Sequence, residues 1–256
     1  MTQADPPLIR KVSIRTILPS AVTLMAFTAG LTAIRFAFQS KWELAVAAIV
    51  VAGILDGLDG TVARLLKSTS RFGAELDSLS DVVAFGVAPA VVLYLWGLQT
   101  LDRPGWAVSL IFAIAMALRL ARFNAQLELE DAEEPRRRLG FLTGVPAPMG
   151  AGLLMMPLMA DFALEDSLIF HHPWFVAPYG IGVAMLMVST LPTFSLKAFR
   201  IPRALFAPFM LLIGATLAAL FAQTWAVLFT IAVIYVLSLP LSWLAYRRRR
   251  NRRNRR

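Results

Sequence analysis

Four aspartates in a hydrophobic part of the chain have the residue type and spacing best suited to chemistry. They lie in the segments DGLDGTVAR and GAELDSLSD, with LLKSTSRF between them, and are Asp56, Asp59, Asp77 and Asp81. A carboxylate inside a membrane segment is costly, so four in one short region imply bound cations and a charged substrate at that depth. We therefore expect the functional site here.

The spacing of these aspartates indicates a metal site. Asp56 and Asp59 are three positions apart and Asp77 and Asp81 are four apart, so on helices each pair shares one face. Four carboxylates cannot all stay ionised in a low-dielectric site, whereas one or two divalent cations would neutralise them and also bind phosphate oxygens. Oxygen ligands without nearby His or Cys favour Mg²⁺ or Mn²⁺ over Zn²⁺.

Small residues and one arginine accompany the first aspartate pair. Gly53 and Gly57 are explained by close helix packing. Gly60 and Ala63, beside an acid and Arg64, instead favour a ligand that approaches the backbone. The Arg64 guanidinium could hold a phosphate with two hydrogen bonds, or it could simply set the membrane orientation.

Composition makes this an all-α polytopic membrane protein. Hydrophobic residues are 58% of the 256 and charged residues only 16%. Spans of ~20 residues each and their short loops use up the chain, so we expect one transmembrane catalytic domain over residues 1–246, including a cytoplasmic segment 1–17, followed by an Arg-rich tail 247–256. The start of the chain lacks the pattern of a cleavable signal peptide. Without cysteine, the chain has no thiol nucleophile or disulfide framework.

Apolar runs predict about eight transmembrane helices. They cover about 18–38, 43–66, 75–98, 105–126, 143–163, 173–193, 204–222 and 225–245. Only a short stretch around Gln223, Thr224 and Trp225 separates the last two runs. Their fusion into one helix would move the C-terminus to the other side of the membrane.

Basic residues predict the orientation. With the N-terminus inside, the outer side receives only Arg35, Lys41 and Arg103, and the other basic clusters fall on the cytoplasmic side. This asymmetry favours an even number of spans and two cytoplasmic termini. The tail RRRRNRRNRR is either a solvated topogenic tail or a surface for anionic lipid headgroups. A bare arginine run after a transmembrane helix does not indicate nucleic-acid binding.

The ordered set around the aspartates resembles the signature of the CDP-alcohol phosphotransferases at every fixed position. It consists of Asp56, Gly57, Asp59, Gly60, Ala63, Arg64, Gly73, Asp77 and Asp81. The segments ELDSLSDVVAFGVAPA, ALRLARFN, FLTGVPAP and MVSTLPTFSLK look like the bacterial phosphatidylserine synthase branch of that family. The resemblance therefore extends from about Leu18 to Lys197.

This resemblance implies an enzyme of the bacterial inner membrane, with its active site toward the cytoplasm. It would transfer the phosphatidyl group of CDP-diacylglycerol to the hydroxyl of L-serine, giving phosphatidylserine and CMP, with two Mg²⁺ or Mn²⁺ ions. It also suggests a homodimer.

The resemblance also implies roles for individual residues. Asp56, Asp59 and Asp77 would bind the metals, and Asp81 would share one of them and act as the general base. The set expected to bind CDP-diacylglycerol is Gly60, Ala63, Arg64 and Gly73, with Gly60 and Ala63 against the cytidine and Arg64 facing the nucleotide or its phosphates.

The serine carboxylate needs cationic or amide donors. Arg119, Arg122 and Asn124, near the inner end of the fourth predicted helix, lie at a suitable depth. Anchoring by the positive-inside rule explains both arginines equally well. Further polar candidates border the fifth and sixth helices, namely Thr143, Pro146, Pro148, Ser189, Thr193, Ser195 and Lys197.

Two kinds of alternative stay open. Within the family, glycerol 3-phosphate, inositol phosphate or choline are alternative acceptors. The basic residues near the pocket are compatible with a phosphorylated acceptor. In a different class, intramembrane acids also mark ion-coupled transporters. A transporter built on an inverted repeat would need a second copy of this intramembrane cluster, which the sequence lacks.

Overall fold

The computed structural model describes residues 14–66, 70–128, 141–164, 168–194, 202 and 205–253. The first half of the chain forms α1 (Ile14–Phe38), α2 (Trp42–Leu65) and one long run made of α3 (Arg71–Asp81), the π-helical η1 (Val82–Val87), α4 (Ala88–Leu93), the π-helical η2 (Tyr94–Leu98) and the 3₁₀ turn η3 (Gln99–Leu101). After it come α5 (Arg103–Glu128), β1 (Phe141–Thr143), α7 (Ala147–Leu154), α8 (Met156–Leu164), α9 (Leu168–His171), α10 (Pro173–Val188), β2 (Pro192–Phe194), α11 (Phe206–Ala222) and α12 (Thr224–Arg253).

Several of these helices are long and apolar enough to cross a membrane. Among the described residues there are five, Ile17–Phe38, Trp42–Leu65, Arg71–Leu101, Arg103–Ala125 and Thr224–Arg247. The pair α7 and α8 is bent by 47° and counts as a sixth span if taken together. The apolar helices α10 and α11 are shorter and complete the eight predicted runs. The all-α polytopic membrane fold is thereby confirmed.

The fifth and sixth predicted helices are shorter than the sequence suggested. Residues 141–143 form a strand that pairs antiparallel with residues 192–194, so the fifth helix begins at Ala147 rather than near 143, and the sixth ends at Val188 rather than near 193. Proline explains both limits, because Pro146 disfavours a helical backbone at Val145 and Pro192 does so at Leu191, while Pro192 also cannot donate a main-chain hydrogen bond to continue the helix. Gly144 makes the turn between strand and helix with φ of +77°, a conformation that favours glycine.

Proline also shapes the bend between α7 and α8. Pro157 is the second residue of α8, so its ring clashes with the preceding turn and removes one helical hydrogen bond.

At the other end of the chain, Gln223 has φ of −143° and ψ of 69°, which separates α11 from α12. The predicted break between the last two helices is confirmed. However, α12 continues to Arg253, so no helix end marks the expected boundary at 247.

Small residues allow the helices around the site to approach closely. A Cβ on Gly30 of α1 would lie 2.7 Å from the Cα of Ala84 in η1, so only glycine fits there. Larger side chains fill the middle of the bundle, where Phe85, Leu93 and Met116 are fully buried. These contacts fix η1 and α4 between α1 and α5.

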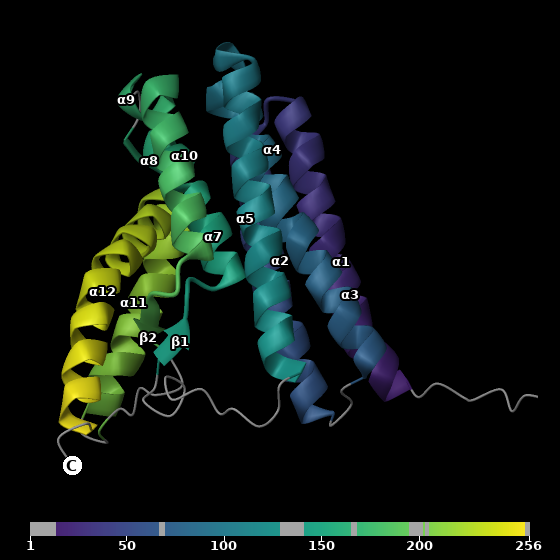
Figure 1. Cartoon of the computed structure of the whole chain (residues 1–256), viewed down its shortest axis with the longest axis vertical. Helices are drawn as coiled ribbons and strands as arrows, with labels where there is room; N and C mark the ends of the chain where they lie inside the picture. Colours follow the sequence, from purple (N-terminus) through teal and green to yellow (C-terminus); the bar gives the residue numbers. More distant parts are fainter. Residues whose placement is uncertain are drawn as a thin grey trace, which may run out of the picture.

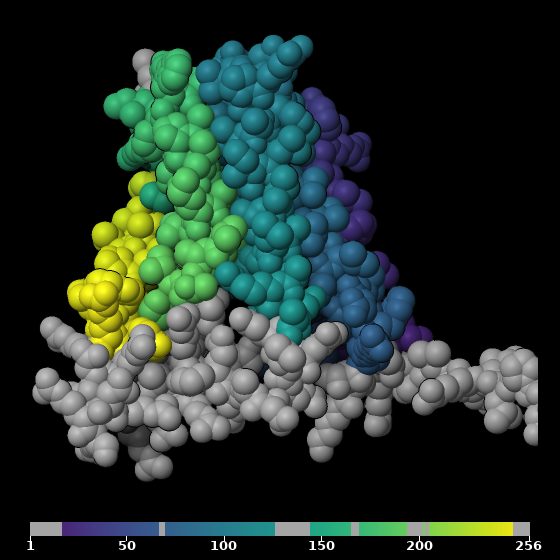
Figure 2. Space-filling model, viewed as in Figure 1, coloured from purple at the N-terminus to yellow at the C-terminus, as the bar shows by residue number. Residues whose placement is uncertain are grey.

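The helices form two groups, α1 to α5 and α7 to α12, which meet where α10 packs along α5 (Figure 1). The start of α1, the end of α2, the start of α3, the end of α5, the two strands and the C-terminal end of α12 all lie at one end of the molecule (Figure 1). On the face in Figure 2, α12 (yellow) stands beside α10 (green), which lies beside the teal and blue helices. This end corresponds to the predicted cytoplasmic side.

Candidate active site

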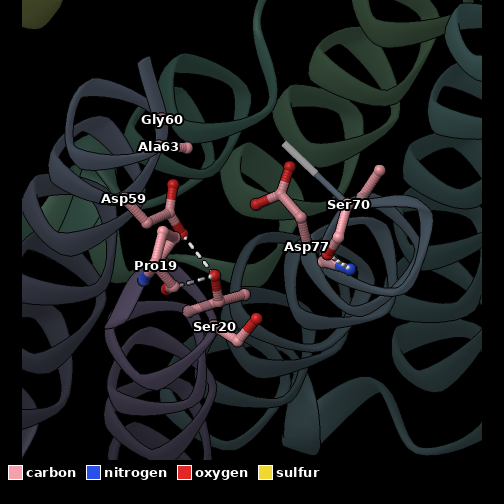
Figure 3. Close-up of a pocket in the computed structure, with 10 residues that line it drawn as sticks. Pro19, Ser20, Asp59, Gly60, Ala63, Ser70 and Asp77 are labelled. Atoms are coloured by element: carbon pink, nitrogen blue, oxygen red, sulfur yellow. Dashed lines mark hydrogen bonds between the residues drawn. The ribbon is translucent and has the colours of Figure 1, made fainter. Parts of the chain in front are cut away.

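Three of the four aspartates converge. Oxygen atoms of Asp56 and Asp59 on α2 and of Asp77 on α3 all lie within 4.8 Å of one another. Figure 3 shows the carboxylates of Asp59 and Asp77 facing each other across a pocket. Mg²⁺ holds its oxygen ligands at ~2.0–2.1 Å, so oxygens on opposite sides of one ion lie about 4 Å apart. The donor set and its size therefore fit divalent cations.

Asp81 lies beside this group rather than in it. Its carboxyl group is within hydrogen-bonding reach of that of Asp56. The π-helical η1 begins at the next residue, Val82, and wide turns of this kind are frequent at functional sites. The neighbouring Ser80 hydroxyl donates to the main-chain carbonyl of Thr23 at 3.2 Å, which holds the end of α3 against α1.

Thr23 of α1 orients Asp59. Its Oγ1 lies 2.7 Å from Oδ2 of Asp59 and 3.1 Å from the carbonyl oxygen of Pro19. Both Thr23 and Asp59 are buried, with 4% and 6% of their surface exposed. A hydrogen bond to the second carboxylate oxygen leaves the first one directed to the site, as is common for metal-binding carboxylates.

A cavity of about 140 Å³ lies next to the aspartates. The residues that line it are Pro19, Ser20, Thr23, Asp59, Gly60, Ala63, Ser70, Gly73, Ala74 and Asp77 (Figure 3). The structure therefore brings together Gly60, Ala63 and Gly73 from the set expected to bind CDP-diacylglycerol. Arg64 is exposed and does not line the cavity; its Nη2 lies 3.4 Å from Oγ1 of Thr61.

The two glycines of the cavity differ in what surrounds them. A Cβ on Gly60 would meet nothing within 4 Å, so the protein leaves open space there. The N–H of Gly73 donates to Oγ of Ser70 at 3.0 Å, which caps the start of α3. A Cβ on Gly73 would lie 3.0 Å from that same oxygen. Gly73 thus has a structural role in addition to the expected ligand contact.

The three α5 residues expected to contact serine have different partners. Arg119 donates from Nε to the carbonyl of Val145 and lies within electrostatic range of Asp81 and Asp56. Arg122 donates from Nη1 to the carbonyl of Val188 at 2.8 Å and from Nη2 to that of Ser189 at 3.2 Å, at the end of α10. Asn124 donates from Nδ2 to Oγ of Ser78 at 2.8 Å, next to Asp77.

Five cavity residues were absent from the sequence-based site, namely Pro19, Ser20, Thr23, Ser70 and Ala74. For Ser20 and Thr23 the one signal in the sequence is a polar residue on an apolar helix near Pro19. That signal is weak because a helical threonine usually bonds its own backbone, as Thr28 does with the carbonyl of Leu24. Of the additional polar candidates, Ser195 and Lys197 and the side chain of Thr143 lie outside the described parts of the chain.

A model of the CDP-alcohol phosphatidyltransferase family matches residues 16–191. The chain belongs to this family. The match runs from α1 to the segment before β2 and includes all four aspartates. It confirms the resemblance seen in the spacing of the acidic and small residues, and with it the reaction class of a CDP-alcohol phosphatidyltransferase.

Two mycobacterial relatives of this CDP-alcohol phosphatidyltransferase cover more of the chain than the family model does. A protein of Mycobacterium leprae named CDP-diacylglycerol–serine O-phosphatidyltransferase is 39% identical over 238 residues, which is 90% of this chain and 77% of the relative. A protein of the same name from Mycobacterium tuberculosis is 38% identical over 90% of this chain and 80% of its own length. Another, from Bacillus subtilis, is 32% identical over 68% of this chain and 88% of its own.

Proposed function

We propose that this protein transfers the phosphatidyl group of CDP-diacylglycerol to the hydroxyl of L-serine, giving phosphatidylserine and CMP. The observation that carries the proposal is the convergence of Asp56, Asp59 and Asp77, with Asp81 next to Asp56. The relatives named for this reaction are 38–39% identical over 90% of the chain, which supports serine as the acceptor.

The reaction exchanges one phosphorus–oxygen bond for another. The serine hydroxyl oxygen bonds to the phosphorus that carries diacylglycerol, the bond from that phosphorus to the CMP phosphate oxygen breaks, and CMP leaves with the electron pair. Asp81 accepts the proton of the serine hydroxyl. Mg²⁺ or Mn²⁺ ions held by Asp56, Asp59 and Asp77, with Asp81 as a shared ligand, would supply positive charge for the pyrophosphate.

The cavity beside the aspartates is the proposed nucleotide site. Gly60 and Ala63 leave the α2 backbone open to the cytidine, and Gly73 borders the same cavity. The exposed side chain of Arg64 is long enough to bind a phosphate of the nucleotide. Exposed apolar side chains of Leu65, Phe72 and Leu79 flank this region of α2 and α3. The acyl chains of the substrate can therefore remain in the bilayer while its headgroup enters the site.

The serine carboxylate is proposed to bind near the end of α5. Arg119 is the best placed of the three candidates because it is near both Asp81 and Asp56. Asn124 is bound to Ser78 beside the metal ligands, and Arg122 is engaged with the end of α10. We assign Arg119 the main contact, with Asn124 and Arg122 as neighbours that shape the site.

For the whole protein we propose a bacterial inner-membrane enzyme with its active site and both termini toward the cytoplasm, working as a homodimer. The asymmetry of basic residues supports the orientation. The dimer rests on the family resemblance alone.

An acceptor panel tests the proposed function. Purified protein is incubated with radiolabelled CDP-diacylglycerol, Mg²⁺ or Mn²⁺, and serine, glycerol 3-phosphate, inositol phosphate or choline in turn. We expect labelled phosphatidylserine, with serine used at least tenfold better than the other acceptors. Preference for a phosphorylated acceptor would overturn the choice of serine but not the reaction type. Absence of CMP release with every acceptor would favour a transporter.

A further inference from the structure

The last helix, α12, lies after the residues matched by the family model, yet it packs against the region of the site. It contacts α8 and the strand β2. Oγ of Ser242 donates to the carbonyl of Pro192 at 2.7 Å, and Ser242 is 1% exposed. α12 is therefore fixed to the strand that pairs with residues 141–143, next to the Val145 carbonyl bound by Arg119.

Tyr235 lies two helical turns before Ser242 and so on the same face of α12. Its hydroxyl oxygen is buried and has no hydrogen-bond partner among the residues that the structure describes. A buried hydroxyl without a partner is unfavourable, and such groups in native proteins are usually satisfied by a ligand or water. The part-buried hydroxyl of Tyr179, by contrast, donates to the carbonyl of Leu153 at 2.6 Å.

The charged group near Tyr235 is Arg119. The guanidinium of Arg119 is within electrostatic range of Tyr235 and also of Asp81. Its one hydrogen bond to the described part of the chain uses Nε, which leaves the Nη groups available for a ligand. The remaining buried side-chain hydroxyl without a described partner, that of Ser109, lies about 15 Å away from Arg119 along α5.

A guanidinium whose charge acts on both a general base and a buried phenol is suited to bind a small anion. A carboxylate accepts charge-assisted hydrogen bonds from arginine, and a tyrosine hydroxyl can donate a further one. The acceptor amino acid must place its hydroxyl near Asp81, so its carboxylate has to be bound within a few ångströms of that base. Arg119, whose charge acts on both Asp81 and Tyr235, is the described residue best suited to this requirement, and the Tyr235 hydroxyl is buried beside it without a described partner.

We propose that Tyr235, contributed by α12, donates a hydrogen bond to the carboxylate of the acceptor serine alongside Arg119 and so determines the preference for an amino-acid acceptor. This inference rests on the proposed function. It gives the C-terminal helix a direct part in acceptor recognition.

Tyr235→Phe tests the inference because it removes only the hydroxyl. We expect the KM for serine to rise at least about tenfold, as for one lost hydrogen bond to a charged group. The KM for CDP-diacylglycerol and the kcat at saturating serine should change less than twofold. Tyr179→Phe is the matched control, because it removes a hydroxyl that bonds the protein itself; it should lower the melting temperature without changing the serine KM.

Serinamide, which lacks the carboxylate charge, provides the second measurement. The wild-type protein should use serine much better than serinamide, and Tyr235→Phe should reduce this preference by most of the tenfold loss. An unchanged serine KM, or an equal loss with serine and serinamide, would overturn the inference while the proposed function stands. If the wild-type protein does not use serine at all, the proposed function itself fails.

Discussion

Asp81 differs from the other aspartates in position, since it contacts Asp56 but lies outside the group of three convergent carboxylates. We predict that Asp81→Asn abolishes transfer while divalent-dependent binding of CDP-diacylglycerol remains, because the amide fills the same space but cannot accept a proton. Turnover is measured with labelled substrate and binding by equilibrium titration. Near-normal turnover of this variant would remove Asp81 from the role of base.

Asp59 and Thr23 allow the metal assignment to be tested in two steps. Asp59→Ala should lose both activity and metal-dependent nucleotide binding, because it removes a ligand. Thr23→Val keeps the shape of the side chain but removes the hydroxyl that orients Asp59, so we predict a ~10–100-fold increase in the Mn²⁺ concentration needed for nucleotide binding.

Thr28→Val is the matched control for Thr23→Val. Thr28 lies on the same helix, is exposed, and bonds only the carbonyl of Leu24 among the described residues. It should leave the Mn²⁺ requirement unchanged. Tight metal-dependent binding in Asp59→Ala would contradict the assignment of ligands, and equal effects of the two threonine changes would show that Thr23 acts only on the helix.

Gly60 tests the nucleotide pocket without disturbing the protein. The added Cβ of Gly60→Ala meets nothing within 4 Å, and alanine favours the helix by up to ~1 kcal/mol. Weaker CDP-diacylglycerol binding in this variant would therefore come from a clash with the ligand, and we predict at least a tenfold increase in KM. Gly182→Ala on α10 is the matched control, because its added Cβ also meets nothing within 4 Å, and it should leave the KM for CDP-diacylglycerol unchanged. An unchanged KM in Gly60→Ala would move the nucleotide elsewhere.

At this scale, spacing indicated the aspartates as a group, and the family resemblance added Gly60, Ala63 and Gly73, which the structure places around one cavity. Each of them is defined by its position relative to another residue of the same or the next helix. Thr23 could not be predicted in this way, since its role depends on how α1 lies against α2. Sequence alone likewise gave no means to distinguish Arg119 from Arg122, because both are arginines at the same helix end.

Among the elements, the inner end of α5 joins the two groups of helices. Arg122 binds the carbonyls of Val188 and Ser189 and so holds the end of α10 in place. We predict that Arg122→Ala costs about 1–3 kcal/mol of stability, visible as a lower melting temperature in detergent. Arg119→Ala should instead raise the serine KM more than Arg122→Ala does.

The opposite pattern would contradict this division of roles. If Arg122→Ala raised the serine KM more than Arg119→Ala at unchanged melting temperature, the serine carboxylate would be bound by Arg122.

The strands β1 and β2, which lie beside the ends of α5 and α10, were not predicted because Phe141–Thr143 lies in an apolar segment that looks helical by composition. Only the pairing with Pro192–Phe194 makes it a strand.

For the whole molecule, the distribution of basic residues predicts the orientation in the membrane. The native chain has no cysteine, so single-cysteine variants can be labelled without background. We predict that cysteines at Ser68 and at Arg255 are labelled from the cytoplasmic side only, and that a cysteine at Ser40, in the connection between α1 and α2, is labelled from the outside. Labelling of Arg255 from the outside with Ser68 inside would mean an odd number of spans.

The membrane fold and the separation of α11 from α12 were predictable because apolar runs and their breaks are local features of the sequence. The bend between α7 and α8 and the packing of α12 on β2 were not, because they depend on contacts between distant segments. The position of Tyr235 near Arg119 belongs to this second class.

The central claim is that an aspartate-bound cation site serves transfer from CDP-diacylglycerol to serine. The most direct test measures CMP and phosphatidylserine together in one reaction of the purified protein, before and after removal of divalent cations with EDTA. We predict that the two products form in equal amounts, only when serine is present, and that both disappear with EDTA and return with Mg²⁺ or Mn²⁺. Phosphatidylserine formation that continues in EDTA, or CMP release that does not need serine, would contradict this account.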